Sequence, residues 1–204
     1  GTDVSINYSK TRSLDREQVN DTTAIMESGT LGYTSDFFKT GGILYFEDFN
    51  IELDHKFSKK LRAAITYMVQ TYNQKIIEGH PNAKMVYSQI AILDLTYKFK
   101  DTKSLQVELQ HLYTKQDKGS WAMLMCQYTI APKWFFALSD LYNYGNSDTS
   151  KQFHYFNASF GYIKNTNRIA LSYGRQRQGI LCVGGVCRYV PASNGITLTI
   201  ISSF

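Results

Sequence analysis

The sequence predicts an all-β fold: an antiparallel, up-and-down transmembrane β-barrel that residues 1–204 form as one domain. First, apolar and polar residues alternate along most of the chain, which is the pattern of strands with one apolar and one polar face. Second, most alternating segments exceed about ten residues, whereas globular strands are usually about five or six residues long and membrane strands need about 9–11. Third, short and long connections alternate, as they do in outer-membrane barrels.

Alternation locates the first strands directly. In "DVSINYSKT", the apolar Val4, Ile6 and Tyr8 alternate with the polar Ser5 and Asn7. The segments "ILYFEDFNIELDHKF", "LRAAITYMVQTYNQ" and "MVYSQIAILDLTYKF" repeat the pattern. Between "DVSINYSKT" and "ILYFEDFNIELDHKF", the stretch "LGYTSDFF" is a candidate for an extra strand.

The rest of the chain continues the alternation in "SLQVELQHLYTK", "SWAMLMCQYTI", "FHYFNASFGY", "NRIALSYG" and the final "GITLTIISSF". The segment "KWFFALSDLYNY" is ambiguous, because its more aromatic face carries Asp140. We therefore expect a bulge or an inward aromatic face in this segment. The ten predicted strands span residues 2–12, 43–57, 61–75, 84–99, 104–115, 120–130, 133–144, 152–163, 167–178 and 194–204.

The connections give the orientation. The short ones are "SKK", "KDTK", "APK" and "KNTN", and the long ones include "EGHPNAK", "KQDKGS", "GNSDTSK" and the stretches 13–42 and 179–193. Because short turns face the periplasm in outer-membrane barrels, both chain termini are expected on the periplasmic side and the strand number is expected to be even. The predicted location is the bacterial outer membrane.

Aromatic residues are expected to form a girdle at the short-turn end, where barrels meet the membrane interface. They are Phe57, Tyr97, Phe99, Tyr162 and the terminal Phe204. A terminal aromatic residue on an alternating last strand also resembles the signal that barrel insertion machinery reads, which implies that machinery as a partner of the C-terminal strand. We expect the last strand to be paired on both sides, by residues 167–178 and by the first strand of the barrel.

Several other classes are less well supported. A soluble β-sandwich or a lipocalin-like cup is the alternative, with the apolar face inward, and the period alone does not distinguish the two orientations. The formal charge of +5 is spread along the chain without a basic run, so a nucleic-acid partner is not expected. No apolar run approaches the roughly 18 residues of a membrane helix. No signal peptide is visible, so Gly1 is a mature terminus or an internal start of a longer chain.

The polar faces of the strands carry charges of both signs, which we expect to point into the barrel lumen. A barrel of about eight strands has room only for side chains, whereas 16–18 strands leave an aqueous channel. A barrel of ten strands is therefore compatible with either a plugged interior or a pore. The predicted lumen charges are Asp48, Glu52, Asp54, Arg62, Asp94, Lys98 and Glu108.

The cysteines suit an oxidising compartment. Cys182 and Cys187 flank "VGGV", whose glycines permit a chain reversal, so we expect a disulfide at the tip of a hairpin on the outer side. Cys126 shares the apolar side of its strand and is expected to be a free thiol facing lipid. No further His or Cys lies at metal-ligand spacing, so neither a metal nor another cofactor is expected.

Two arginines follow the outer end of a strand in "YGRQRQG". Arg175 and Arg177 have the planar, bidentate donors that suit phosphate, so they are candidates for contact with lipopolysaccharide. The alternative is that the two arginines are solvent-exposed residues at the base of a loop and bind no ligand. The chain has no G-x-S-x-G, H-E-x-x-H or P-loop motif, so we do not expect an enzyme.

The stretch "YGRQRQGILCVGGVCRYVPASNGITLTIISSF", together with "LYTKQDKGSWAM" and "WFFALSDLYNYG", resembles an uncharacterised outer-membrane family of Bacteroidota, a domain of unknown function. The resemblance runs from about Phe49 to Phe204 and implies a fold and a location, but no activity. Members of that family are longer, which leaves open whether this chain is complete or is the C-terminal part of a larger barrel.

The resulting hypothesis is an integral outer-membrane protein without catalytic activity, acting as a structural or accessory subunit of an outer-membrane complex. Its expected partners are outer-membrane lipid, lipopolysaccharide and other outer-membrane proteins. A porin-like channel for small solutes is the alternative, and a barrel enzyme is the third reading.

Overall fold

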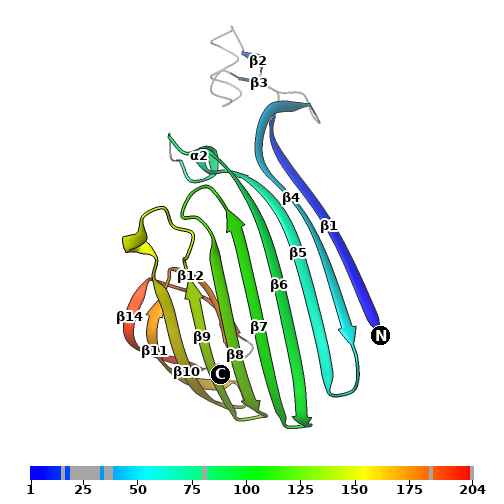
Figure 1. Cartoon of the computed structure of the whole chain (residues 1–204), viewed down its shortest axis with the longest axis vertical. Coiled ribbons are helices and arrows are strands. Elements are labelled where there is room, and N and C mark those ends of the chain that lie inside the picture. Colours follow the sequence, from blue (N-terminus) through cyan, green and yellow to red (C-terminus); the bar gives the residue numbers. More distant parts are fainter. Residues whose placement is uncertain (15–16, 19–32, 35–38, 80–81, 184–185, 203–204) are drawn as a thin grey trace.

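A ten-stranded antiparallel sheet dominates the computed structural model, which describes the chain except for residues 15–16, 19–32, 35–38, 80–81, 184–185 and 203–204. Each strand pairs with the next sheet strand along the chain, so the topology is up-and-down (Figure 1). The strands, in spatial order, are β1 (Thr2–Leu14), β4 (Thr40–Lys56), β5 (Leu61–Asn73), β6 (Met85–Lys100), β7 (Lys103–Thr114), β8 (Trp121–Ile130), β9 (Trp134–Tyr142), β10 (His154–Lys164), β11 (Asn167–Gln176) and β14 (Ser193–Ile201).

The long connections contain short strands and helical turns. Two short hairpins are formed by β2 (Glu17–Gln18) with β3 (Tyr33–Thr34) and by β12 (Gly179–Val183) with β13 (Val186–Val190). One helical turn, α2 (Gln74–Ile77), follows β5, and a 3-10 turn, η1 (Thr149–Lys151), precedes β10. The sequence did not predict the helical turns, and of "LGYTSDFF" only Tyr33–Thr34 forms a described strand.

The predicted all-β antiparallel fold is confirmed, and each of the ten predicted strands corresponds to one strand of the sheet. The largest boundary differences are at Thr40 and Ile201, each three residues from the predicted end. The short connections lie at the same end of the sheet as the start of β1 and the end of β14, and the long connections lie at the opposite end (Figure 1). Below, these are the turn end and the loop end.

The expected irregularity in β9 is absent. Its pairing with β8 and with β10 runs without a register shift, so the segment contains no bulge. Its more aromatic face, with Trp134, Phe136 and Asp140, shares a side with Leu124 and Phe160 of the neighbouring strands, and the buried Phe135 points the other way. The ambiguous segment is therefore an ordinary strand whose aromatic face continues that of its neighbours.

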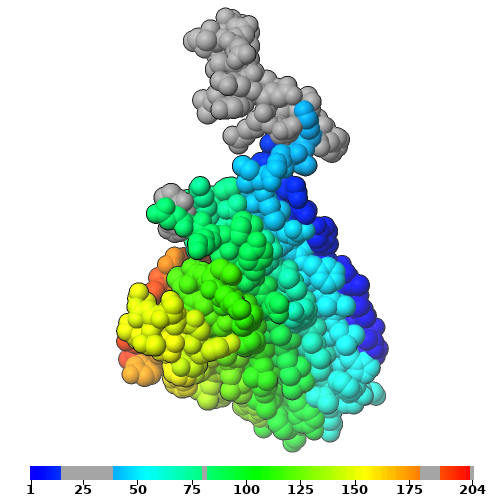
Figure 2. Space-filling model, turned by 45° about the horizontal axis from the view of Figure 1, so that its top comes forward, coloured from blue at the N-terminus to red at the C-terminus, as the bar shows by residue number. Residues whose placement is uncertain are grey.

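The two margins of the sheet are β1 and β14. Figure 2 shows the blue N-terminal strand along one edge of the molecular surface. We expected β14 to be paired on both sides, but among the described residues it pairs only with β11, from Ser193 opposite Gln176 to Ile201 opposite Arg168. The sheet is open, so closure into a barrel stays a prediction.

Candidate functional site

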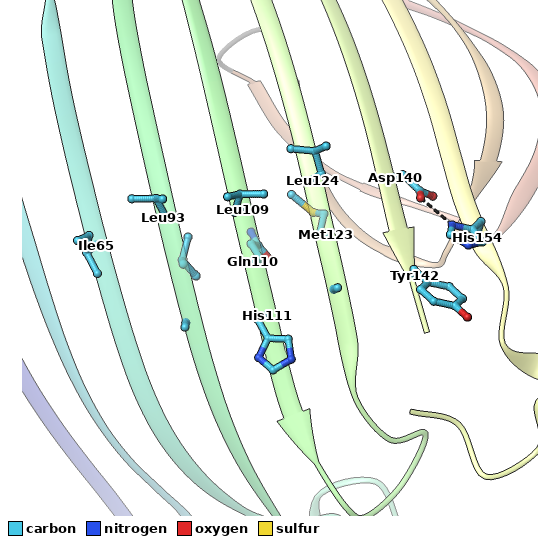
Figure 3. A pocket seen from close by; sticks show the side chains of 13 residues that line it. Ile65, Leu93, Leu109, Gln110, His111, Met123, Leu124, Asp140, Tyr142 and His154 are labelled. Atoms are coloured by element: carbon cyan, nitrogen blue, oxygen red, sulfur yellow. Dashed lines mark hydrogen bonds and ion pairs between the residues drawn. The ribbon is translucent and has the colours of Figure 1, made fainter. Parts of the chain in front are cut away.

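The two sides of the ten-stranded sheet have opposite chemistry. The outer face carries Leu53 and Leu109, and the inner face carries Asp54 and Glu108. On the outer face a row of aliphatic side chains crosses neighbouring strands as register partners: Leu53, Ile65, Leu93, Leu109 and Leu124. Figure 3 shows the last four in line across β5 to β8. Leu109 is 44% exposed and Leu124 is 45% exposed, so this row is a surface and not a core.

Exposed apolar residues occupy the outer face over the whole width of the sheet. Contiguous apolar surface of this extent marks a site that contacts another apolar medium or a partner. The outer-face residues with exposed side chains include Val4, Ile6, Phe49, Ile51, Leu53, Ile65, Tyr67, Val69, Leu95, Leu109, Leu124, Phe136, Leu138, Phe156, Phe160, Ile169, Leu171, Tyr173, Ile196, Leu198 and Ile200.

Aromatic rings collect on the outer face near the turn end. The ring centroids of Tyr97 and Phe99 are 5.0 Å apart, and Phe99 is 6.2 Å from Tyr128. Trp134 lies 4.5 Å from Tyr162, one of the residues predicted for the girdle. Phe57, Tyr97 and Phe99 also lie beside the short turns as expected. The predicted insertion signal, Phe204, lies outside the described residues.

The predicted lumen charges all lie on the inner face, because Asp54, Ala64, Asp94 and Glu108 follow one another in register across β4 to β7. The structure brings Arg62 and Asp54 together: the Arg62 Nε donates to both carboxylate oxygens of Asp54, at 2.9 and 2.7 Å. The carboxylate of Asp94 accepts a hydrogen bond from Gln106. Among the residues that the structure describes, the remaining predicted charges, Asp48, Glu52, Lys98 and Glu108, make no ion pair.

Between β8 and β11 the inner face is filled. The Phe135 side chain is only 1% exposed, and the Arg168 guanidinium lies 4.4 Å from its ring centroid. Gly161, the register partner of Phe135, makes room for the ring, because a Cβ there would lie 2.2 Å from it. The neighbouring Asn157 is buried too. Sequence reasoning missed Arg168 and Asn157, although both occupy the polar positions of their alternating strands.

A polar rim borders the outer face at the loop end. The Nδ1 of His154 lies 2.7 Å from a carboxylate oxygen of Asp140, and the ring of Tyr142 stacks on His154 with centroids 4.0 Å apart (Figure 3). At the other side of the sheet, the Lys10 Nζ donates to Glu47 at 2.8 Å. Asp140, which made its segment ambiguous, therefore belongs to this rim.

The two candidate arginines lie at the loop end of the inner face. The Cζ of Arg175 is 3.9 Å from the ring centroid of Phe153 and 5.1 Å from that of Tyr155. The Cζ of Arg177 is 4.5 Å from the ring centroid of Trp121. Both arginines line a cavity of about 860 Å³. The lipopolysaccharide contact that we expected for them stays a prediction.

The cysteines occupy the expected positions of the backbone. Cys182 and Cys187 are direct register partners in the hairpin of β12 and β13. Directly opposed residues of antiparallel strands have Cα atoms about 4.5–5.5 Å apart, which a disulfide can bridge. Their side chains lie outside the described residues, so the disulfide stays a prediction. Cys126 is a free thiol whose register partners, Val107 and Leu138, lie on the outer face.

Neither a metal site nor a membrane-spanning helix is found in the described part of the chain. No three His, Cys, Asp or Glu side chains gather there as a group that could hold a metal ion. No helix there is both long and apolar enough to cross a membrane.

Comparison with known proteins gives a family and no activity. One family model, described as a family of unknown function, matches residues 1–204. Its match is wider than the resemblance found in the sequence, which began near Phe49, and its description names no organism and no location. No curated protein and no solved structure matches the chain.

Proposed function

The chain belongs to the family of unknown function DUF6029, and we propose that it is an integral β-barrel protein of a bacterial outer membrane, of the Bacteroidota type. The observation that carries the proposal is the polarity of the two faces. In a soluble barrel the apolar face would point inward. Here Leu109 and Leu198 are exposed on the outer face, while Asp54 and Asn157 are buried on the inner face.

The dimensions of the outer face support a membrane-spanning role. In β6, the uninterrupted series of apolar and aromatic outward residues runs from Ala91 to Phe99, which is about 27 Å along a strand at the usual rise per residue. The tilt of about 35–45° that is typical of membrane strands reduces this to about 20 Å, close to the apolar band about 25 Å tall of outer-membrane barrels. The aromatic cluster at the turn end and the polar rim at the loop end border this band, as the interfaces of a bilayer require.

The proposal includes a partner for each margin of the sheet. An unpaired strand edge in hydrocarbon leaves backbone groups unsatisfied, each costing several kcal/mol. The margins β1 and β14 are therefore paired in the membrane, either with each other or with further strands. A cysteine pair at Ile6 and Leu198 in a background without native cysteines tests the first option. Its control is a pair at Leu171 and Leu198, which are register partners. Self-closure is ruled out if the control crosslinks while no pair that combines one of residues 4–8 with one of residues 196–200 does.

Within the membrane we propose a structural or accessory subunit without catalytic activity. The filled inner face between β8 and β11, with Phe135 and Arg168 packed together, supports a plugged interior. A porin-like channel is the second candidate, and it is favoured by a cavity of about 600 Å³ on the inner face of β5 to β9, lined by Glu108 and Gln110. The proposed partners are lipid, lipopolysaccharide at Arg175 and Arg177, other outer-membrane proteins, and insertion machinery at the C-terminal strand.

Location and orientation are tested by labelling intact cells that express the protein. Asn146 lies in a long connection and Thr102 in a short turn. In a background without native cysteines, Asn146→Cys is expected to react with a membrane-impermeant maleimide and Thr102→Cys to react only after the outer membrane is opened. Recovery of the protein in a soluble fraction, or equal labelling of both sites in intact cells, contradicts the proposal.

The two roles are separated by conductance and by co-purification. A subunit is expected to leave a planar bilayer insulating and to purify with fixed partners. Ion conductance by the isolated protein, without such partners, supports the channel instead.

A further inference from the structure

A cavity of about 860 Å³ opens at the loop end of the inner face. Its walls come from β8, β10, β11 and β14 and from the connections that precede β8, precede β10 and follow β11. Its volume is within the range of about 300–1,000 Å³ of small-molecule sites. Among the residues that the structure describes, four cationic side chains line it, at Lys118, Lys151, Arg175 and Arg177, and none of these described lining residues is Asp or Glu. Only Lys151 has a carboxylate partner among the described residues, because its Nζ lies 3.0 Å from Asp148. The cavity therefore favours an anion.

Aromatic rings hold the two guanidinium groups in place. Arg175 lies over the rings of Phe153 and Tyr155, and Arg177 lies over Trp121. A guanidinium stacked on a ring still presents its N–H groups along its edge, in the planar fork that binds a phosphate or carboxylate with two hydrogen bonds. Because neither arginine is paired with a carboxylate in the described part of the chain, both forks are available to a ligand.

A buried amide in the cavity wall lacks a partner. The Gln176 side chain is 8% exposed, and its Nε2 has no hydrogen-bond partner among the described residues. An unsatisfied buried donor is unfavourable, and a hydrogen-bond acceptor on a ligand would satisfy it. Further amides and hydroxyls that line the cavity, at Asn194, Gln178 and Ser193, supply both donors and acceptors. Such mixed groups match the hydroxyls of a sugar.

We propose that this cavity binds a phosphorylated saccharide. The two ring-held arginines and Lys118 bind the phosphate, and the amides, including that of Gln176, bind the sugar hydroxyls. The ligand is either a free sugar phosphate or the phosphorylated sugar of a lipid headgroup, which share this chemistry. The proposal deepens the lipopolysaccharide contact proposed above for Arg175 and Arg177 by naming the class of ligand. It is argued from the lining of the cavity, so its test does not depend on whether the protein is a subunit or a channel.

The binding test uses the full chain folded in detergent micelles. The protein has two tryptophans, and Trp121 lies in the cavity against Arg177, so Trp134→Phe leaves one reporter at the site. Glucose 6-phosphate is titrated while Trp121 emission is recorded. Glucose, inorganic phosphate and detergent-solubilised deep-rough lipopolysaccharide are titrated separately at the same ionic strength. Glucose 6-phosphate is expected to bind saturably, at least tenfold more tightly than glucose or inorganic phosphate.

Two variants with matched controls locate the binding. Arg177→Gln is expected to weaken binding of glucose 6-phosphate at least fivefold, and Arg12→Gln, which removes a charge from β1, is expected to leave it unchanged. Asn194→Asp adds a carboxylate to the cavity at constant size and is expected to weaken binding at least tenfold. Its control is Asn165→Asp in a turn at the opposite end. Asn194→Asp removes no packing contact. It therefore still shows whether the cavity is the binding site if Arg177→Gln disturbs folding.

Each outcome decides for or against the proposal. Displacement of glucose 6-phosphate by lipopolysaccharide, with loss of both in Asn194→Asp, supports it and identifies a lipid-attached sugar as a ligand. Inorganic phosphate binding as tightly as glucose 6-phosphate reduces the cavity to a plain anion site and overturns it. The absence of any saturable response, or equal effects of Asn194→Asp and Asn165→Asp, overturns it too.

Discussion

Phe135 and Phe136 are neighbours in β9, yet their side chains lie in opposite surroundings. Phe135 is 1% exposed on the inner face, against Gly161 and beneath Arg168. Phe136 is 45% exposed on the outer face, with its ring centroid 4.9 Å from that of Phe160. The same residue type is a packed core residue at one position and a surface residue at the next. The difference shows that position in the alternation, and not hydrophobicity, decides which residues this sheet buries.

The largest expected effect separates these two phenylalanines. Phe135→Ala is expected to lower the free energy of unfolding by about 3–5 kcal/mol, because it leaves a cavity in a filled region. Phe136→Ala is expected to cost about 1 kcal/mol or less, because under the proposed membrane location lipid fills the space that the ring leaves. Denaturant unfolding of both variants in lipid bilayers measures the two costs. Equal costs would mean that the two faces are packed alike.

The next prediction places the same charge on the two faces. Leu109→Lys is expected to cost up to about 2–4 kcal/mol if the site lies near the bilayer midplane. Gln110→Lys puts the charge on the inner face beside Glu108, where the Gln110 amide now donates a hydrogen bond, and is expected to cost less than about 1 kcal/mol. Folding yield into liposomes and denaturant midpoints check both variants. A Gln110→Lys defect as large as that of Leu109→Lys would argue for a soluble barrel with inverted faces.

A smaller volume change sharpens the comparison. Gly161→Ala introduces a Cβ 2.2 Å from the Phe135 ring and is expected to destabilise the protein by about 1–3 kcal/mol. Ala158→Val adds bulk to the outer face of the same strand, where its register partners are Leu138 and Tyr173, and is expected to be nearly neutral. The same unfolding measurement applies to both. A neutral Gly161→Ala would show that the inner face is loosely packed.

The smallest effect concerns a loop that belongs to neither face. The pKa of Asp148 is lowered by hydrogen bonds from Ser150 and by Lys151, whose Nζ lies 3.0 Å away. Because the folded-state pKa is depressed, the stabilising contribution is present above the unfolded pKa, near pH 4, and is lost as the pH falls through the folded value. Asp148→Asn is therefore expected to cause a slight fall in denaturant midpoint at pH 7, and this fall is expected to shrink as the pH is lowered below 4. A difference that grows toward low pH contradicts this account.

Alternation along the chain was sufficient to predict the ten strands, because each strand carries its own pattern. It also placed Asp54 and Arg62 on one face, since the two faces differ in parity alone. It could not predict the pairing of Phe135 with Gly161, because alternation within one strand does not fix its register against the next strand. Nor could it predict the stacking of Arg177 on Trp121, because Arg177 lies beyond the end of β11, where the alternation no longer applies. Nor could it decide which face points outward, since both orientations share one period.

The central claim is that the outer face contacts lipid while the inner face does not. The two tryptophans test it directly, because Trp134 lies on the outer face and Trp121 on the inner face. The single-tryptophan variants Trp121→Phe and Trp134→Phe are folded into liposomes that contain phosphatidylcholine with brominated acyl chains. Bromine is expected to quench the fluorescence of the remaining Trp134 strongly and that of the remaining Trp121 weakly. Stronger quenching of Trp121 than of Trp134, or equal quenching of both, would contradict the account.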